Sequence, residues 1–178
     1  VTAASYSGAS TSAVAFPDPA RRPYPDPRPA GSAVSASSAL HAVLEDSEEG
    51  TLMETLGMEV VTRDANRTEV RMPVDGARQV IGILHGGATA AIIETAASVA
   101  ARRAAPAGAV PVGAELTVSH LRPVRSGYVT AVASPVHQGR STCLYEVRVS
   151  DDEGRAVARG TLRSLYTRPD ARSDDDAA

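Results

Sequence analysis

A long apolar segment near the middle of the chain constrains the fold more than any other feature. Residues 88–101 are alanine, threonine, isoleucine, serine and valine, and Glu94 is the only charged residue among them. A helix built from this segment has small or apolar residues on every side, which is typical of a helix that is buried all round. We therefore expect a central helix over residues 87–103, ended by Pro106 and Gly108 and wrapped by the rest of the chain.

Glu94 is the unusual member of this helix. A buried carboxylate is costly unless a charged or polar group stabilises it, and burial raises the pKa of a carboxyl group, which suits a general base or a nucleophile. The triplet His85-Gly86-Gly87 stands directly before the helix. Its glycines let another group approach the first-turn N–H groups, where the helix dipole is positive. A carboxylate and an anion-stabilising helix start are the pair of groups that acyl transfer needs.

The size and composition of the chain exclude several classes of protein. Its 178 residues are enough for one domain with a sizeable core. A net charge of −3, with five Tyr, one Phe and no Trp, provides neither a basic field nor stacking platforms for nucleic acid. The single cysteine, Cys143, excludes an internal disulfide, and no metal-ligand spacing occurs. Without a membrane-span or secretory-signal pattern, we expect a soluble, cytoplasmic protein.

Composition divides the chain into three parts. Residues 1–38 are rich in Ala, Ser and Pro, with six prolines between Pro17 and Pro29, which favours a disordered arm, with a binding arm as the alternative. The folded domain is predicted to span residues 39–167. Residues 168–178 include three consecutive aspartates and are predicted to form a flexible acidic tail.

The folded part predicts short helices and six strands around the central helix. The apolar pattern of residues 39–56 indicates one or two short helices interrupted near Gly50. Period-2 patterns between turn residues indicate two short strands before the central helix and four after it. We place these strands at residues 58–63, 69–72, 112–121, 128–137, 141–150 and 156–166. A four-stranded antiparallel meander after a buried helix predicts an α+β domain whose sheet wraps the helix.

Several motifs together resemble the hotdog-fold thioesterases. They are Gln79, His85-Gly86-Gly87, Glu94 nine residues after that histidine, and His120-Leu121-Arg122. The chain is most similar, over residues 56–166, to the branch with 1,4-dihydroxy-2-naphthoyl-CoA thioesterase, the enterobactin proofreading thioesterase and the 4-hydroxybenzoyl-CoA thioesterases that use a helix glutamate. The resemblance therefore implies a hotdog fold, in which an antiparallel sheet wraps one long buried helix.

The resemblance implies a catalytic role for five residues. Glu94 would be the nucleophile or general base, and the backbone N–H of Gly86 would donate to the oxyanion. Gln79 and His85 would position the thioester carbonyl, and Ser98 would help to place water. The ordinary alternatives are a helix-start turn for the His-Gly-Gly triplet, a structural acid paired with an arginine for Glu94, and simple packing for Ser98.

The resemblance also implies residues that bind substrate. His120 would line the pocket, while Arg122 and the turn Gly139-Arg140 would contact the phosphates or the pantetheine of coenzyme A. These arginines could instead be ordinary surface charges, and His120 could be a core or interface histidine. Relatives often carry a proline and an aromatic residue where this chain has Val80-Ile81, so the identity of the acyl group is the point on which the resemblance is least informative.

The spacing of Gly86 and Glu94 predicts a site shared between two chains. Eight residues at ~1.5 Å rise per residue place them about 12 Å apart along a helix. Reacting atoms must approach to roughly 3–3.5 Å, so one carbonyl cannot contact both groups of one chain. We therefore expect a homodimer with shared active sites and, by resemblance, a homotetramer.

The expected function is hydrolysis of an acyl-CoA thioester with an aromatic or medium-sized acyl group. No cofactor is expected, because coenzyme A is part of the substrate. One alternative is an editing thioesterase acting on acyl-carrier-protein thioesters. A second is a non-catalytic acyl-CoA-binding protein of the same fold, and a third is a hotdog dehydratase, although the histidine of that class does not come with this pattern.

Overall fold

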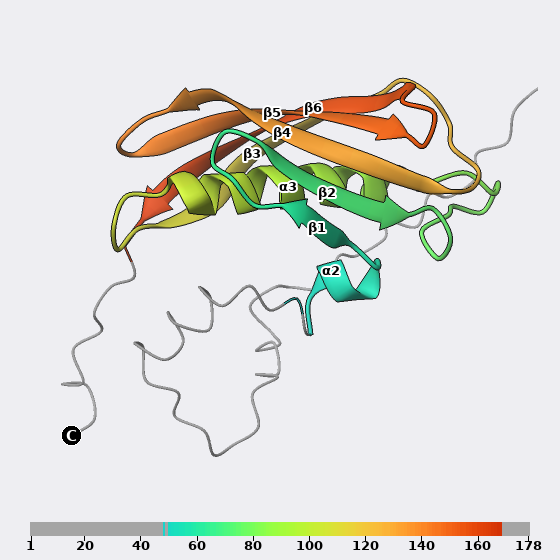
Figure 1. The fold of residues 1–178 in the computed structure, drawn as a ribbon, viewed down its shortest axis with the longest axis horizontal. Coiled ribbons are helices and arrows are strands. Elements are labelled where there is room, and N and C mark those ends of the chain that lie inside the picture. The colour runs from blue at the N-terminus through green and yellow to red at the C-terminus, as the bar shows by residue number, and fades with distance from the viewer. Residues whose placement is uncertain (1–47, 49, 169–178) are drawn as a thin grey trace, which may run out of the picture. The chain divides into compact units, whose positions relative to one another are not determined.

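The long helix lies against one concave antiparallel sheet in the computed structural model, which describes residues 48 and 50–168 (Figure 1). The helix is α3 (Gly86–Ala104), and a short helix, α2 (Leu52–Thr55), precedes the sheet. The six strands are β1 (Glu59–Thr62), β2 (Thr68–Pro73), β3 (Val110–His120), β4 (Tyr128–Gln138), β5 (Thr142–Asp151) and β6 (Ala156–Thr167). The predicted α+β hotdog class is confirmed. The predicted arm, and the predicted tail beyond Arg168, lie outside the described residues.

The order of the strands differs from the expected meander. The sheet runs β1-β2-β4-β5-β6-β3, so β3 pairs with β6 at the far edge and β4 pairs with β2. The segment between β3 and β4 is therefore no hairpin turn. It crosses the end of the sheet, where the carbonyl of Val124 accepts from Leu84 N–H at 2.8 Å and that of Gly127 accepts from Val74 N–H at 2.9 Å. The seven residues 121–127, which include Pro123, are long enough for this crossing, which turn composition alone does not reveal.

One face of α3 packs on the concave side of the sheet. Ile92, Ile93 and Ala96 are fully buried there, and the helix contacts strands β2 to β6. Close approach depends on Gly160 of β6, because a Cβ atom at this position would lie 3.1 Å from Cγ2 of Ile93 and would collide with the carbonyl oxygen of Thr117. The absence of a side chain at Gly160 thus makes room for the large side chain of Ile93.

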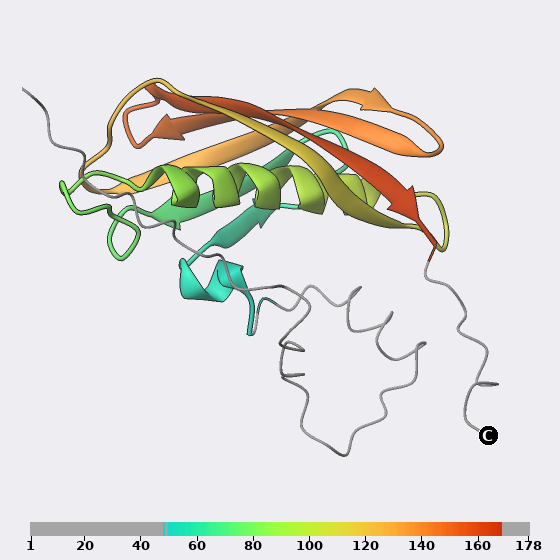
Figure 2. The ribbon, with the colours of Figure 1, turned by 180° about the vertical axis from the view of Figure 1, so that it is seen from behind.

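The expectation of a helix buried all round is wrong for the single chain. Gly87, Glu94 and Arg102 are exposed on the other face of α3, and Figure 2 shows most of the helix in front of the strands. The physical reason is the alanine-rich sequence. Alanine fits a sheet-facing surface and an open surface equally well, so composition does not reveal which face the sheet covers.

Tyr145 of β5 anchors the C-terminal part of α3. Its buried hydroxyl lies 2.8 Å from the carbonyl oxygen of Ala65 and 3.3 Å from that of Ala100, and it accepts a hydrogen bond from Gln138 at 2.8 Å. Burial raises the pKa of this phenol, so it stays protonated and able to donate. The turn between β4 and β5 therefore lies near the C-terminal part of the helix.

The close contact at Gly160 gives a stability prediction. Gly160→Ala should lower the free energy of unfolding by about 1–3 kcal/mol, because overpacking forces the helix away from the sheet. Gly113→Ala on the neighbouring strand is the matched control, since a Cβ atom there would meet Leu162 at 3.4 Å and Glu94 at 3.5 Å, both ordinary contacts. Urea unfolding of both variants measures the effect, and equal stability of the two would contradict the packing described.

Candidate active site

The first turn of α3 presents unused hydrogen-bond donors. His85 is the N-cap residue, and its Nδ1 accepts from Gly87 N–H at 2.8 Å, while its carbonyl accepts from Thr89 N–H at 3.1 Å. A neutral imidazole that accepts at Nδ1 carries its proton on Nε2, which is then free to donate. The N–H of Gly86 has no partner among the described residues. The positive end of the helix dipole thus carries a backbone donor beside an imidazole donor.

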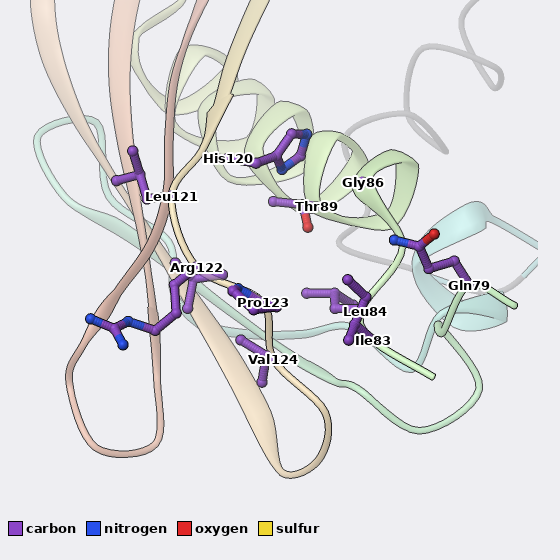
Figure 3. Close-up of a pocket in the computed structure, with 11 residues that line it drawn as sticks. Gln79, Ile83, Leu84, Gly86, Thr89, His120, Leu121, Arg122, Pro123 and Val124 are labelled. Carbon is purple, nitrogen blue, oxygen red and sulfur yellow. The ribbon is translucent and has the colours of Figure 1, made fainter. Parts of the chain in front are cut away.

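A loop held by internal hydrogen bonds places Gln79 beside the first turn of α3. Gln79 N–H donates to the carbonyl of Ile83 at 2.8 Å, and the Gln79 carbonyl accepts from Gly82 N–H at 2.9 Å, with Gly82 at a φ of 77°. The Arg78 guanidinium donates to the Asp75 carboxylate at 2.8 Å and to the Arg125 carbonyl at 3.0 Å. These bonds hold the loop in one shape, and Figure 3 shows Gln79 beside the first turn of α3.

Gln79, Gly86, Thr89 and His120 line one cleft of about 380 Å³ (Figure 3). His120 ends β3, and its Nε2 lies only 3.2 Å from the position that a Cβ atom on Gly86 would take. A side chain at residue 86 would therefore push this imidazole away. The remaining lining is mostly apolar: Ile83, Leu84, Leu121, Pro123, Val124 and Val157, with Arg122.

The residues expected to bind coenzyme A do not gather at this cleft. Arg122 belongs to the lining, but Figure 3 shows its guanidinium pointing away from Gly86 and His120. Gly139 and Arg140 follow Gln138, whose side chain bonds Tyr145 near the C-terminal part of α3. Within one chain, the turn Gly139-Arg140 and the helix start are therefore at opposite ends of the helix.

Glu94 lies in a second cleft, of about 290 Å³, along the open face of α3. Ser98 and Thr95 share this cleft with Glu94, and α2 supplies Leu52 and Met53 as its outer wall. The other lining residues are Ala91, Val99 and Arg102. Glu94 is exposed in the single chain and has no ion-pair partner among the described residues, so the structure shows no arginine that would make it a structural acid.

The two clefts have no lining residue in common. Gln79, His85, Gly86 and His120 come together at the start of α3, whereas Glu94 and Ser98 face another cleft. Eight residues of regular helix separate Gly86 from Glu94, which corresponds to about 12 Å along the axis. One chain thus carries candidate hydrogen-bond donors and a candidate carboxylate, but not in one place.

Sequence reasoning missed three residues of the Glu94 cleft. Arg102 follows Glu94 by eight positions and shares its helical face, a spacing that could have revealed it. Leu52 and Met53 reach the cleft through the tertiary position of α2, for which the sequence carries no local signal.

The described residues form neither a membrane-spanning helix nor a metal site. No helix in residues 50–168 is long and apolar enough to cross a membrane. In the same part of the chain, no group of three or more His, Cys, Asp or Glu side chains is placed to hold a metal ion.

Known proteins that are similar to this chain include thioesterases. The thioesterase superfamily model matches residues 81–158. The proofreading thioesterase EntH of Klebsiella pneumoniae is 41% identical over 115 residues, which cover 64% of this chain and 84% of the relative. A solved thioesterase of Haemophilus influenzae is 32% identical, with a TM-score of 0.65 over 68% of this chain and 85% of that one. The PaaI protein of Escherichia coli shares the fold, at 24% identity and a TM-score of 0.61. The chain therefore belongs to the thioesterase superfamily and is a thioester hydrolase.

Proposed function

We propose that the protein hydrolyses acyl-CoA thioesters with an aromatic or medium-sized acyl group, in a site that two subunits form together. One observation carries the proposal: oxyanion donors and carboxylate line two separate clefts of a chain that belongs to a thioester hydrolase family. A second copy of the chain supplies the missing half of each site.

The start of α3 supplies the electrophilic half of the site. The free N–H of Gly86 donates to the carbonyl oxygen of the thioester and to the oxyanion that develops from it. The side-chain amide of Gln79 and Nε2–H of His85 can position the same carbonyl. Loss of one oxyanion donor costs on the order of 2.7–4 kcal/mol in known sites, so donors of this kind can lower the barrier to attack on a thioester substantially.

Glu94 supplies the nucleophilic half. As a general base, its carboxylate takes a proton from a water molecule held by Ser98, and the resulting hydroxide adds to the thioester carbon. As a nucleophile, it forms an anhydride with the acyl group, which water then hydrolyses. In both routes the tetrahedral intermediate expels the coenzyme A thiolate, a good leaving group, so no strong general acid is required.

The exposed edge of β3 provides a place for the second copy. Within residues 50–168, this strand of eleven residues pairs with β6 on one side only, and Val112 in it is 50% exposed. An open, long edge strand is a template for pairing with another chain. If two β3 edges pair about a two-fold axis, the two α3 helices lie antiparallel. An axis level with Ala90, midway between residues 86 and 94, then brings Gly86 of one subunit to Glu94 of the partner subunit. The homotetramer stays a prediction.

A carrier-protein thioester is the second candidate substrate. The observation that favours it is the relative from Klebsiella pneumoniae, which is named a proofreading thioesterase. The same acyl group presented on coenzyme A and on a phosphopantetheinyl carrier protein distinguishes the two. A kcat/KM that is much higher for the carrier-protein thioester would favour the editing function.

The role of Glu94 is tested by Glu94→Gln. We expect a folded protein whose turnover, followed by thiol release, falls at least about a hundredfold, because an amide neither accepts a proton nor attacks a carbonyl. Glu59→Gln makes the same change at an exposed acid of β1 and should leave turnover unchanged. Undiminished thiol release by the Glu94 variant would refute the assignment.

The shared site predicts complementation between two inactive chains. Mixing equal amounts of the Glu94→Ala and Gln79→Ala chains and allowing subunit exchange should restore about a quarter of wild-type activity. Half of the dimers are then mixed, and each mixed dimer holds one intact site of two. If mass spectrometry confirms the mixed dimers and they remain inactive, each site belongs to a single chain.

The lining of the Glu94 cleft predicts the preferred acyl groups. Leu52, Met53, Ala91 and Val99 offer an apolar wall to a hydrocarbon chain or ring. Benzoyl-CoA and hexanoyl-CoA should therefore exceed acetyl-CoA by at least about tenfold in kcat/KM, while neighbouring chain lengths differ little, since one methylene changes discrimination by only ~1–3 kcal/mol. A panel in which acetyl-CoA is the best substrate would contradict an extended apolar pocket.

A further inference from the structure

The cleft that contains Glu94 carries a positively charged side chain, Arg102, at its opposite end. Glu94, Ser98 and Arg102 follow one another at four-residue intervals along α3, so all three side chains lie on one helical face. All three line the same cleft. It thus begins at a carboxylate, passes a hydroxyl group and ends at a guanidinium.

The walls between these ends are apolar. Leu52 and Met53 of α2 cover the cleft from outside, Val99 lies between Glu94 and Arg102, and Ala91 lies behind Glu94. Leu52 remains 59% exposed in the single chain. Methylene groups fit such walls, whereas the amides of pantetheine would lose hydrogen bonds to water there. The direction from Glu94 toward Arg102 therefore suits the acyl group of a substrate rather than its coenzyme.

Arg102 is available for an anionic ligand. Its side chain is exposed and has no ion-pair partner among residues 48 and 50–168. Several other exposed arginines are bound by carboxylates, for example Arg163, which lies 2.8 Å from Glu115, and Arg155, which lies 2.7 Å from Asp151. A guanidinium recognises a carboxylate well, because its paired N–H donors match the two carboxylate oxygens.

We propose that the cleft between Glu94 and Arg102 binds acyl groups that end in a second carboxylate, with Arg102 as the residue that recognises it. The substrate class is the coenzyme A half-thioester of a linear dicarboxylic acid. This inference rests on the proposed acyl-CoA hydrolysis, whose site it extends toward the C-terminal end of α3.

The length of the cleft sets the length of the acyl chain. Eight residues of helix separate Glu94 from Arg102, about 12 Å along the axis. The thioester carbonyl lies next to the Glu94 carboxylate, and the Arg102 side chain can fold back over part of the distance. An extended acyl chain of about six to eight carbons spans the remaining gap.

Adipoyl-CoA and hexanoyl-CoA form the matched substrate pair, because they have the same carbon chain and differ only in the distal carboxylate. In the wild-type protein, we expect kcat/KM for adipoyl-CoA to be at least tenfold higher than for hexanoyl-CoA. Arg102→Gln should remove this preference by lowering only the adipoyl-CoA value, and Arg102→Lys should restore part of it. Arg103→Gln is the matched control. It removes an adjacent positive charge from the same helix end at a residue outside the cleft lining, and it should leave both values unchanged.

Binding gives a second readout that does not depend on turnover. In a Glu94→Gln background, calorimetry should show tighter binding of adipoyl-CoA than of hexanoyl-CoA, and adding Arg102→Gln should abolish the difference. If the Arg102 variants lose kcat/KM and affinity equally for both substrates, Arg102 contacts the coenzyme and the inference is overturned. An unchanged preference for adipoyl-CoA in these variants would overturn it as well. If the wild-type protein hydrolyses hexanoyl-CoA and benzoyl-CoA but the Arg102 variants change no substrate preference, only the inference about Arg102 fails and the proposed acyl-CoA hydrolysis remains supported. Failure to hydrolyse any acyl-CoA would instead contradict that function.

Discussion

The packing of one side of α3 against the concave sheet determines the rest of the structure. Ile93 packs against Gly160 of β6, where the absence of a side chain lets helix and strand approach. This contact fixes the rotation of the helix about its axis. Once that rotation is set, Glu94 lies on an exposed side of the helix with its carboxylate close to Gly113 of β3, and the first turn of the helix faces the crossing segment that contains Val124. The positions of both chemical groups thus follow from a packing contact that contains neither of them.

A single chain therefore exposes two incomplete surfaces. The helix start has donors without a carboxylate, and the open face of α3 has a carboxylate without donors. Exposed Glu94 is also hydrated in the single chain. A second subunit over the open face of α3 would remove water from the carboxylate and strengthen its electrostatic interaction with the reacting carbonyl. In this account, assembly of the subunits and activation of the base are one event.

Much of the fold was predictable from the sequence, because the helix and all six strands carry strong local patterns. The position of β3 could not be predicted, because a seven-residue connection through Pro123 does not reveal that the chain crosses to the opposite edge of the sheet. The separation of Gly86 from Glu94 was predictable, because helical rise converts spacing into distance. Which side of the helix is exposed could not be predicted, because alanine suits buried and exposed positions alike. The position of Leu52 at the cleft depends on the tertiary packing of α2, which a local sequence pattern does not predict.

The most direct test of a two-chain site is specific activity measured alongside oligomeric state during dilution. Val112→Lys on the exposed edge of β3 should weaken the pairing of two edges, because a charged side chain on an edge strand opposes pairing with another chain, and so bring dissociation into an accessible concentration range. Analytical ultracentrifugation gives the assembled fraction at each concentration. We predict that thiol release per chain falls in proportion to that fraction and extrapolates to none for the monomer. A folded monomer that retains full activity per chain would contradict the account.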